Sequence, residues 1–230
     1  MTRTSLVPFL RARLDAFAKA DSGLAAIEFA YVLPFLAIAM MGSAEVARYV
    51  NAVRGLTNAA NSMAEMLSQG STGKVDYLAL TAATDSTMVL FPQVLSDSYS
   101  KGVGWRTDIN IKVSSIEFVK TVPTCTTSCA YTANLAFSFG DSKRLCSVHP
   151  TAVADDAVIA NNTLPTDVFA PGSIIAVEIS YDYTPFYGIG VIPATTIHRA
   201  AYFHPRQVTL IKYDDTVAGD PGTTTKCAGY

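Results

Sequence analysis

The chain has 230 residues, enough for one ordinary domain and an additional segment. Half of the residues are apolar and 16% are charged, so a sizeable core can form. The formal net charge of −2 favours neither nucleic acid nor an acidic surface as a partner. No zinc-finger spacing and no phosphate-binding glycine loop is present, so we expect no nucleic-acid partner, no metal and no cofactor.

A basic leader occupies residues 1–23, ahead of an apolar stretch. Its larger apolar residues recur at near-helical spacing, which predicts a short amphipathic helix at the inner face of a membrane. They are Leu6, Leu10, Leu14 and Phe17. The leader differs from an ordinary secretory signal peptide, because its basic part is long and no small-residue cleavage site follows the apolar region. Any cleavage would therefore fall before that region, after Gly23.

A membrane span is predicted at about 24–44. No charged residue lies between Glu28 and Glu45, but these 16 residues are slightly fewer than the ~20 that a span needs, so the span must include Glu28. An acid at mid-bilayer costs roughly 2–3 kcal/mol, so this carboxylate needs an explanation. Four basic residues precede the span and two follow it closely, which places the N-terminus in the cytoplasm and residues beyond about 45 outside. The six are Arg3, Arg11, Arg13 and Lys19, then Arg48 and Arg54.

Helical periodicity continues past the span and predicts one helix over residues 24–69. Pro34 should kink or loosen it, and the stretch QGSTG should end it. A heptad seam runs along its second half. The seam residues are Val46, Tyr49, Val53, Leu56, Ala60, Met63 and Leu67. We expect the seam to pack against the protein's own sheet; the alternative is a partner helix, for which residues 46–56 are the better candidate.

Residues 70–230 are predicted to form an exterior α+β domain. A second helix is expected at about 75–89, after which the apolar period changes to two. Strands are predicted over 109–118, 131–139, 175–183 and 197–203, with a continuation at 208–211. The phase of alternation changes at Ser114–Ser115, which predicts a bulge there. Residues 140–170 form a polar insertion with a helical turn near 153–159. The expected fold is a long N-terminal helix plus an antiparallel sheet of about four strands, with one buried side covered by a helix.

All four cysteines follow the span, on the side predicted to be oxidising. They are Cys125, Cys129, Cys146 and Cys227. An even number predicts two disulfides, with three possible pairings. The stretch CTTSC could suggest a redox or metal pair, but thioredoxin-type motifs have two intervening residues and a metal site would need further ligands. We therefore expect Cys125–Cys129 to close a hairpin loop, and Cys146–Cys227 to tether a polar tail that would otherwise be disordered.

The basic leader, the glycine, the acid and the apolar helix together resemble a type IV pilin-like precursor. The stretch SGLAAIEFAYVLPFLAIAMMGSAEVAR resembles the TadE/TadG-like minor pilins of the tight adherence (Flp) pilus. The matching residues are Gly23, Glu28, Phe29 and Leu33–Pro34. Downstream, VEISYDYTPFYG and HPRQ resemble the C-terminal strand pair of that family. The matching residues there are Tyr183, Pro185, Pro205 and Arg206.

The resemblance implies that a prepilin peptidase cleaves after Gly23, where a glycine suits a pocket without room for a side chain. Cleavage frees the α-amine of Leu24, and Glu28 supplies its carboxylate partner inside a bundle of helices. The other implied partners are Flp/Tad pilins, bound through the N-terminal helix, and inner-membrane lipid. The protein would be single-pass in the inner membrane with a periplasmic domain, and it could be incorporated into an extracellular pilus.

Two other functions stay open from the sequence. Glu28 could mark only the headgroup edge of an uncleaved bitopic anchor whose exterior domain binds a ligand or acts as an adaptor. A membrane-tethered hydrolase has the least support, because no nucleophile elbow or other catalytic signature is present. The histidines are scattered: His149, His198 and His204. The aromatic cluster is assigned to packing, with carbohydrate binding as its alternative. It comprises Tyr181, Tyr183, Phe186 and Tyr187. We therefore predict a structural protein rather than an enzyme.

Overall fold

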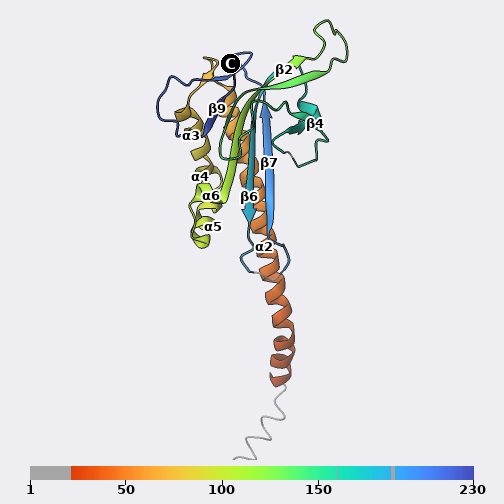
Figure 1. Cartoon of the computed structure of the whole chain (residues 1–230). Helices are drawn as coiled ribbons and strands as arrows, with labels where there is room; N and C mark the ends of the chain where they lie inside the picture. The colour runs from red at the N-terminus through yellow and green to blue at the C-terminus, as the bar shows by residue number, and fades with distance from the viewer. Residues whose placement is uncertain (1–21, 159, 188–189) are drawn as a thin grey trace, which may run out of the picture. The chain divides into compact units, whose positions relative to one another are not determined.

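Helix α2 runs from Ser22 to Ser68 and continues through Pro34 (Figure 1). At 1.5 Å per residue its 47 residues extend over ~70 Å. It belongs to a computed structural model that describes residues 22–158, 160–187 and 190–230. The predicted long helix is therefore confirmed, whereas the amphipathic leader helix lies outside the described residues.

The described residues divide into two compact units. One unit combines the chain up to Arg48 with Pro185–Ile192, and the other combines Tyr49–Thr184 with Pro193–Tyr230. In the first unit, α2 is long and apolar enough to cross a membrane, and its large apolar side chains are exposed from Ile27 to Met40. A short stretch from the far end of the sequence therefore groups with the apolar part of the helix.

In the second unit, α2 buries a broad stripe. Leu56, Ala60, Met63 and Leu67 are all buried, so the heptad seam packs within the protein's own fold, as predicted. Three further alanines widen the stripe beyond the seam, namely Ala52, Ala59 and Ala64. Val46, at the start of the seam, is 43% exposed, so the seam is buried only over its later part.

Four short helices follow α2. They are α3 (Tyr77–Asp85), α4 (Thr87–Leu90), α5 (Gln93–Lys101) and α6 (Trp105–Asp108). The single helix predicted at 75–89 is thus two helices, α3 and α4, which meet at Ser86. The Asp76 carboxylate caps α3 by accepting the backbone N–H of Ala79 at 2.7 Å. Helix α5 was not predicted, although its buried residues Val94, Asp97 and Ser98 recur at helical spacing.

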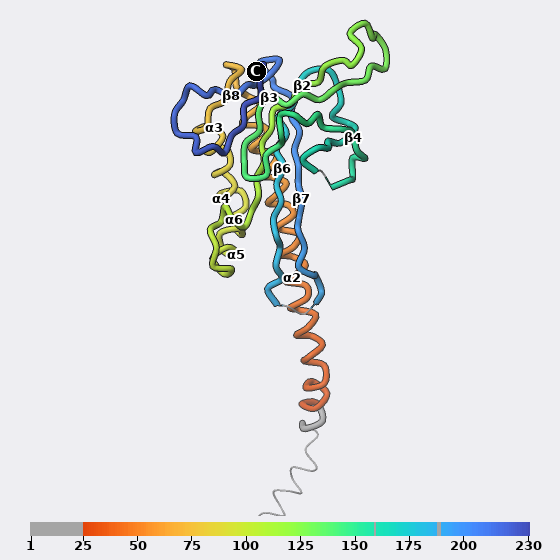
Figure 2. The backbone as a smooth tube through the Cα atoms, viewed as in Figure 1, coloured from red at the N-terminus to blue at the C-terminus, as the bar shows by residue number. Residues whose placement is uncertain are grey.

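The second unit contains a five-stranded antiparallel sheet in the order β7-β6-β2-β3-β9. The strands are β2 (Ile109–Lys120), β3 (Tyr131–Phe139), β6 (Gly172–Tyr183), β7 (Thr195–Phe203) and β9 (Thr224–Lys226). Figure 2 shows β6 and β7 side by side, with β2 on the other side of β6. The four predicted strands and the α+β class are confirmed; β9 was not predicted.

The predicted bulge is present in the β2–β3 ladder, but its extra residue lies on β3. Ser115 pairs with Phe137 and Ile116 with Leu135, so Ala136 is the additional residue. The β2–β6 register is unbroken. The apolar alternation along β2 therefore shifts because a different face of the strand is buried beyond Ser115, and not because β2 itself contains a bulge.

Both faces of the sheet are buried, which corrects the expectation of one buried side. On the first face the Tyr181 ring packs edge-on against Phe91 at 5.1 Å, and Tyr183 packs against Tyr49 at 5.3 Å. On the second face, one end carries an apolar cluster that includes parts of the insertion. Its buried members are Ile116, Phe118, Ala133, Leu135, Leu164, Ile174, Ala176 and Cys227. Alternation over a whole strand could not reveal a face that is buried over only part of its length.

The insertion contains two short parallel strands, β4 (Thr151–Val153) and β5 (Thr163–Pro165), and a 3-10 turn η1 (Thr166–Val168). The helical turn predicted near 153–159 was wrong, because Val153 ends a strand and residues 154–158 form a turn and a bend. The Asp155 carboxylate accepts the backbone N–H of Asp167 at 3.0 Å, which connects this turn to η1.

The structure contains the two expected disulfides, Cys125–Cys129 and Cys146–Cys227. The predicted strand at 208–211 is displaced to β8 (Lys212–Tyr213), which pairs in parallel with β1 (Lys74–Val75) in a separate two-stranded sheet.

The polar C-terminal tail is held by hydrogen bonds as well as by the Cys146–Cys227 disulfide. Partial burial of Asp220 raises its pKa, but hydrogen bonds from Thr224, Tyr213 and Thr223 outweigh burial and lower the pKa to about 2. The Tyr213 hydroxyl donates to this carboxylate at 2.8 Å, and the Gly222 N–H donates at 2.9 Å. The polar tail is thus organised by one carboxylate as well as by its disulfide.

Candidate functional site

The apolar half of α2 exposes side chains all around its circumference. Large apolar residues are between 49% and 73% exposed from Ile27 to Met40. They are Ile27, Phe29, Tyr31, Val32, Leu33, Phe35, Leu36, Ile38 and Met40. A helix that is apolar on every side is suited to a bilayer or to the core of a helix bundle. The arrangement provides a surface for lipid or for neighbouring helices.

The predicted processing and assembly residues lie at the start of this helix. Gly23 and Leu24 are in its first turn, and Glu28 follows Leu24 by four residues, so their positions share one helix face. Glu28, Phe29 and Pro34 are exposed. Leu24 and Glu28 therefore occupy positions about one turn apart on α2.

Glu45 is a residue whose importance sequence reasoning missed. It ends the uncharged run, yet only 1% of it is exposed. One carboxylate oxygen accepts the backbone N–H groups of Phe186 and Tyr187, at 3.0 and 3.2 Å. The Arg48 guanidinium lies 5.1 Å from the centroid of the Phe186 ring. The sequence signal that could have pointed to Glu45 was an acid three residues before an arginine, Arg48, at the end of a predicted span.

The two C-terminal segments singled out by the resemblance both contact α2. Tyr183 packs on Tyr49 in the second unit, whereas Phe186 and Tyr187 are held by Glu45 in the first. The HPRQ segment closes the end of the helix, because the Arg206 N–H donates to the Ser68 carbonyl at 3.0 Å. The Arg206 guanidinium also lies 2.9 Å from Glu65. Both C-terminal segments of the resemblance therefore contact α2, the helix that contains its N-terminal segment.

The aromatic cluster separates into two pairs. Tyr181 and Tyr183 are buried, which agrees with their assignment to packing. Phe186 is 70% exposed and Tyr187 41% exposed, although their rings touch each other edge-on at 5.0 Å. The second pair therefore presents apolar surface outward.

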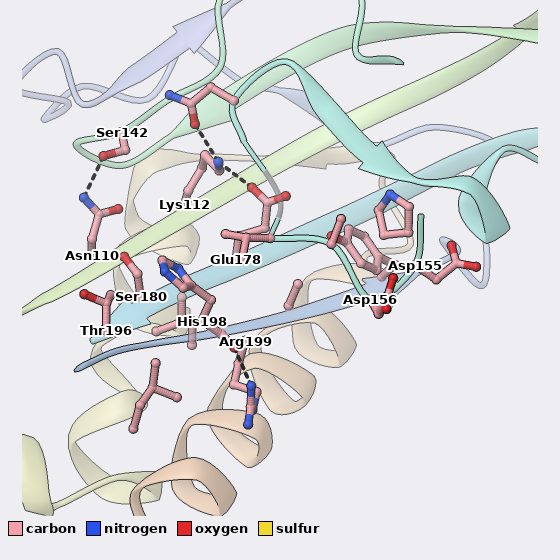
Figure 3. A pocket seen from close by; sticks show the side chains of 18 of the residues that line it. Asn110, Lys112, Ser142, Asp155, Asp156, Glu178, Ser180, Thr196, His198 and Arg199 are labelled. Carbon is pink, nitrogen blue, oxygen red and sulfur yellow. Dashed lines mark hydrogen bonds and ion pairs between the residues drawn. The ribbon is translucent and has the colours of Figure 1, made fainter. Parts of the chain in front are cut away.

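A polar pocket of about 600 Å³ lies on the second face of the sheet, beside the insertion (Figure 3). Strands β2, β6 and β7 supply one wall, and the turn at residues 155–158 supplies another. The polar wall residues of the sheet are Asn110, Lys112, Glu178, Ser180, Thr196, His198, Arg199 and Tyr202. In Figure 3 Asp155 and Asp156 stand on the side of the insertion.

The charges at the base of this pocket pair with one another. Glu178 accepts Lys112 at 2.6 Å and Arg144 at 2.5 Å, and Arg144 also donates to the carbonyl of Asn161 at 2.7 Å. Burial lowers the pKa of Lys112, while the Glu178 charge opposes that shift. Burial, followed by the Glu178 charge, raises the pKa of Tyr202. We call Lys112, Arg144 and Glu178 the ionic cluster; it fastens the insertion to the sheet.

The histidines do not form a site together. Nδ1 of His149 lies 3.2 Å from the Ala133 carbonyl and Nδ1 of His204 lies 2.8 Å from the Ser173 carbonyl, while His198 lines the pocket. Within residues 22–158, 160–187 and 190–230, no three groups of His, Cys, Asp or Glu are grouped to hold a metal ion.

The comparison with protein families gives one match. The model described as TadE-like protein matches residues 23–64, which are 42 of the 230 residues. The matched segment comprises almost all of α2 and includes Glu28, Pro34 and Glu45. No curated protein and no solved structure matches the chain.

Proposed function

Because residues 23–64 are TadE-like, we propose that this protein is a minor pilin that takes part in assembly of a Flp-type (Tad) pilus. The TadE-like family is structural and associated with the Tad pilus, which supports a role among pilus components rather than in catalysis. The observation that carries the proposal is the coincidence of this match with a helix whose apolar side chains are exposed on every side.

In this proposal the chain has three parts. Residues 1–23 are a cytoplasmic leader that a prepilin peptidase removes, and residues 24–69 are the helix that spans the inner membrane at about 24–44. Residues 70–230 form a periplasmic domain with its insertion at about 140–170. The excess of basic residues before the span supports this orientation.

We expect Gly23→Leu to block processing, because the leucine side chain must enter a pocket that accepts glycine. The uncleaved chain should accumulate in the inner membrane, 23 residues longer than the mature form. N-terminal sequencing of the wild-type protein should begin at Leu24. Gly23→Ala, which adds only a methyl group, is the matched control and should be cleaved more completely than Gly23→Leu. A wild-type chain that keeps Met1 would favour the alternative function, an uncleaved membrane anchor with a ligand-binding or adaptor domain.

Glu28→Ala should be processed normally but should assemble poorly. In a helix bundle the ammonium of Leu24 would lose its carboxylate partner, and breaking a buried pair costs about 3–5 kcal/mol, so incorporation into pili should fall at least about tenfold. Immunoblots of sheared pili measure the effect. Glu65→Ala provides a control on the same helix, because the Glu65 side chain is 46% exposed and its ion pair with Arg206 lies at the surface. Wild-type incorporation of Glu28→Ala would exclude the pairing role.

A further inference from the structure

The segment between strands β6 and β7 is unusually apolar for a loop. No aspartate, glutamate, lysine or arginine occurs between Asp182 and Arg199. Within it Phe186 is 70% exposed, Val191 48% and Tyr187 41%. We call these three residues the apolar tip. Exposed apolar residues grouped in this way mark an interaction surface more often than scattered single ones do.

The apolar tip is attached to α2 where its uncharged run ends. Glu45 holds the tip by accepting the N–H groups of Phe186 and Tyr187, and Glu45 is itself buried by this contact region. Accordingly residues 185–192 group with the chain up to Arg48 rather than with the sheet. The position of the tip along the helix is therefore fixed by named hydrogen bonds.

That position corresponds to the edge of a bilayer. The proposed span, residues 24–44, extends over ~31 Å of helix, close to the ~30 Å of a hydrocarbon core. Glu45 is the first ionisable residue after them, so it lies at the boundary between hydrocarbon and headgroups. Arg48 is one turn farther along, at a depth where a guanidinium can reach lipid phosphates.

We propose that the apolar tip inserts into the interfacial layer of the membrane leaflet on the side of the exterior domain, and so forms a second membrane contact. The proposal rests on the proposed function, in which α2 spans the membrane. Tyrosine and other aromatic side chains favour this layer because their rings are apolar and their edges accept polar neighbours. Insertion covers Phe186 and Val191, which are otherwise in water. It also sets the depth of α2, because Glu45 joins the tip to one turn of the helix.

Lipid is favoured over a protein partner because the apolar tip adjoins the exposed apolar stretch of α2. The tip follows directly on a helix stretch whose side chains are uncovered on all sides, so the same lipids that surround Phe35 or Met40 reach it. A loop of this composition carries no charge that would select a particular protein surface. The occupant is therefore the headgroup and upper acyl region of the bilayer.

Single tryptophans test the depth of the tip. The full chain carries one tryptophan, Trp105, which is first replaced by phenylalanine. Phe186→Trp is then made in that background, and the protein is reconstituted in vesicles of phosphatidylethanolamine and phosphatidylglycerol. Bromine atoms placed at different depths of the acyl chains quench nearby indole emission. Interfacial groups lie about 5–10 Å into the boundary region, so bromines near the ester end should remove roughly half of the emission. Bromines at the chain end should have several-fold less effect.

Two control variants separate the inference from its premise. Phe35→Trp replaces an exposed residue of the span and should be quenched by deep bromines. Met66→Trp replaces a 46% exposed residue of α2, ~31 Å beyond Glu45 along the same helix, and should not be quenched. If Phe35→Trp is quenched and Phe186→Trp is not, the tip faces water or protein and the inference is wrong. If Phe35→Trp escapes quenching, the span itself is refuted, and the inference with it. The three tryptophan substitutions replace exposed side chains, so the fold should tolerate them.

Discussion

Glu178→Gln should lower the free energy of unfolding of the sheet-containing unit by about 3–5 kcal/mol, the usual effect of removing one partner from a buried ion pair. The side chains of Arg144 and Lys112 are only 1% and 8% exposed, and both lie within 2.6 Å of the Glu178 carboxylate. A neutral amide of the same shape leaves two buried cations beside each other without an anion. The insertion should then detach from the sheet before the rest of the unit unfolds.

Pulse proteolysis of the full chain in detergent, over a series of urea concentrations, measures this loss. Asp182→Asn is the matched control, because Asp182 lies on the same strand but is exposed, and its effect should stay within about 0.5 kcal/mol. Adding Lys112→Met to Glu178→Gln should recover part of the stability, since one of the two stranded cations is removed. Equal midpoints for wild type and Glu178→Gln would show that the ionic cluster contributes nothing.

Removing the Cys146–Cys227 disulfide should cost about 4 kcal/mol, because the bond closes a loop with a sequence separation of 81. The Cys146→Ser/Cys227→Ser variant avoids a free thiol. Strand β9 is held to β3 by only three residue pairs, so residues after about 213 should become sensitive to protease. Tyr230 should also lose its 2.8 Å hydrogen bond to Glu117, since it lies beyond the released cysteine.

The second disulfide supplies the comparison for this prediction. Cys125 and Cys129 are four residues apart, and closing so small a loop contributes about 2 kcal/mol in the same chain-entropy treatment. Cys125→Ser/Cys129→Ser should therefore shift the urea midpoint about half as far and leave the tail protected. Similar losses from the two double variants, or a tail that stays resistant to protease without Cys227, would contradict the assignment of the tether.

Features with a local period were predictable from the sequence. The length of α2 follows from its 3.6-residue pattern and the glycine-rich stop, and four strands follow from alternation. The pairing of Cys146 with Cys227 followed once the short CTTSC loop was assigned to its own bond. Strand β9 was missed because its sequence TTK carries no alternation, and its place in the sheet depends on the disulfide beside it.

The contacts at the candidate sites could not be predicted from the sequence, for a different reason. Glu45 binds backbone groups 141 and 142 residues away, and the buried Arg144 pairs with Glu178, which is 34 residues away. A charged residue gives no local sign of a distant partner, so neither the contact of Glu45 nor that of Arg144 was predicted. The same limit applies to the tip, whose aromatic residues were assigned to packing although Phe186 and Tyr187 are exposed.

The placement of β9 at the edge of β3 has a consequence for biogenesis. If the exterior domain crosses the membrane with its N-terminal end first, β2, β3, β6 and β7 all emerge before residues 224–227 arrive. Until then the edge of β3 is open and Cys146 has no partner. Completion of the sheet therefore waits for the last part of the chain to be translocated, which keeps the domain loosely folded during passage. The closing bond then locks it once the oxidising side is reached.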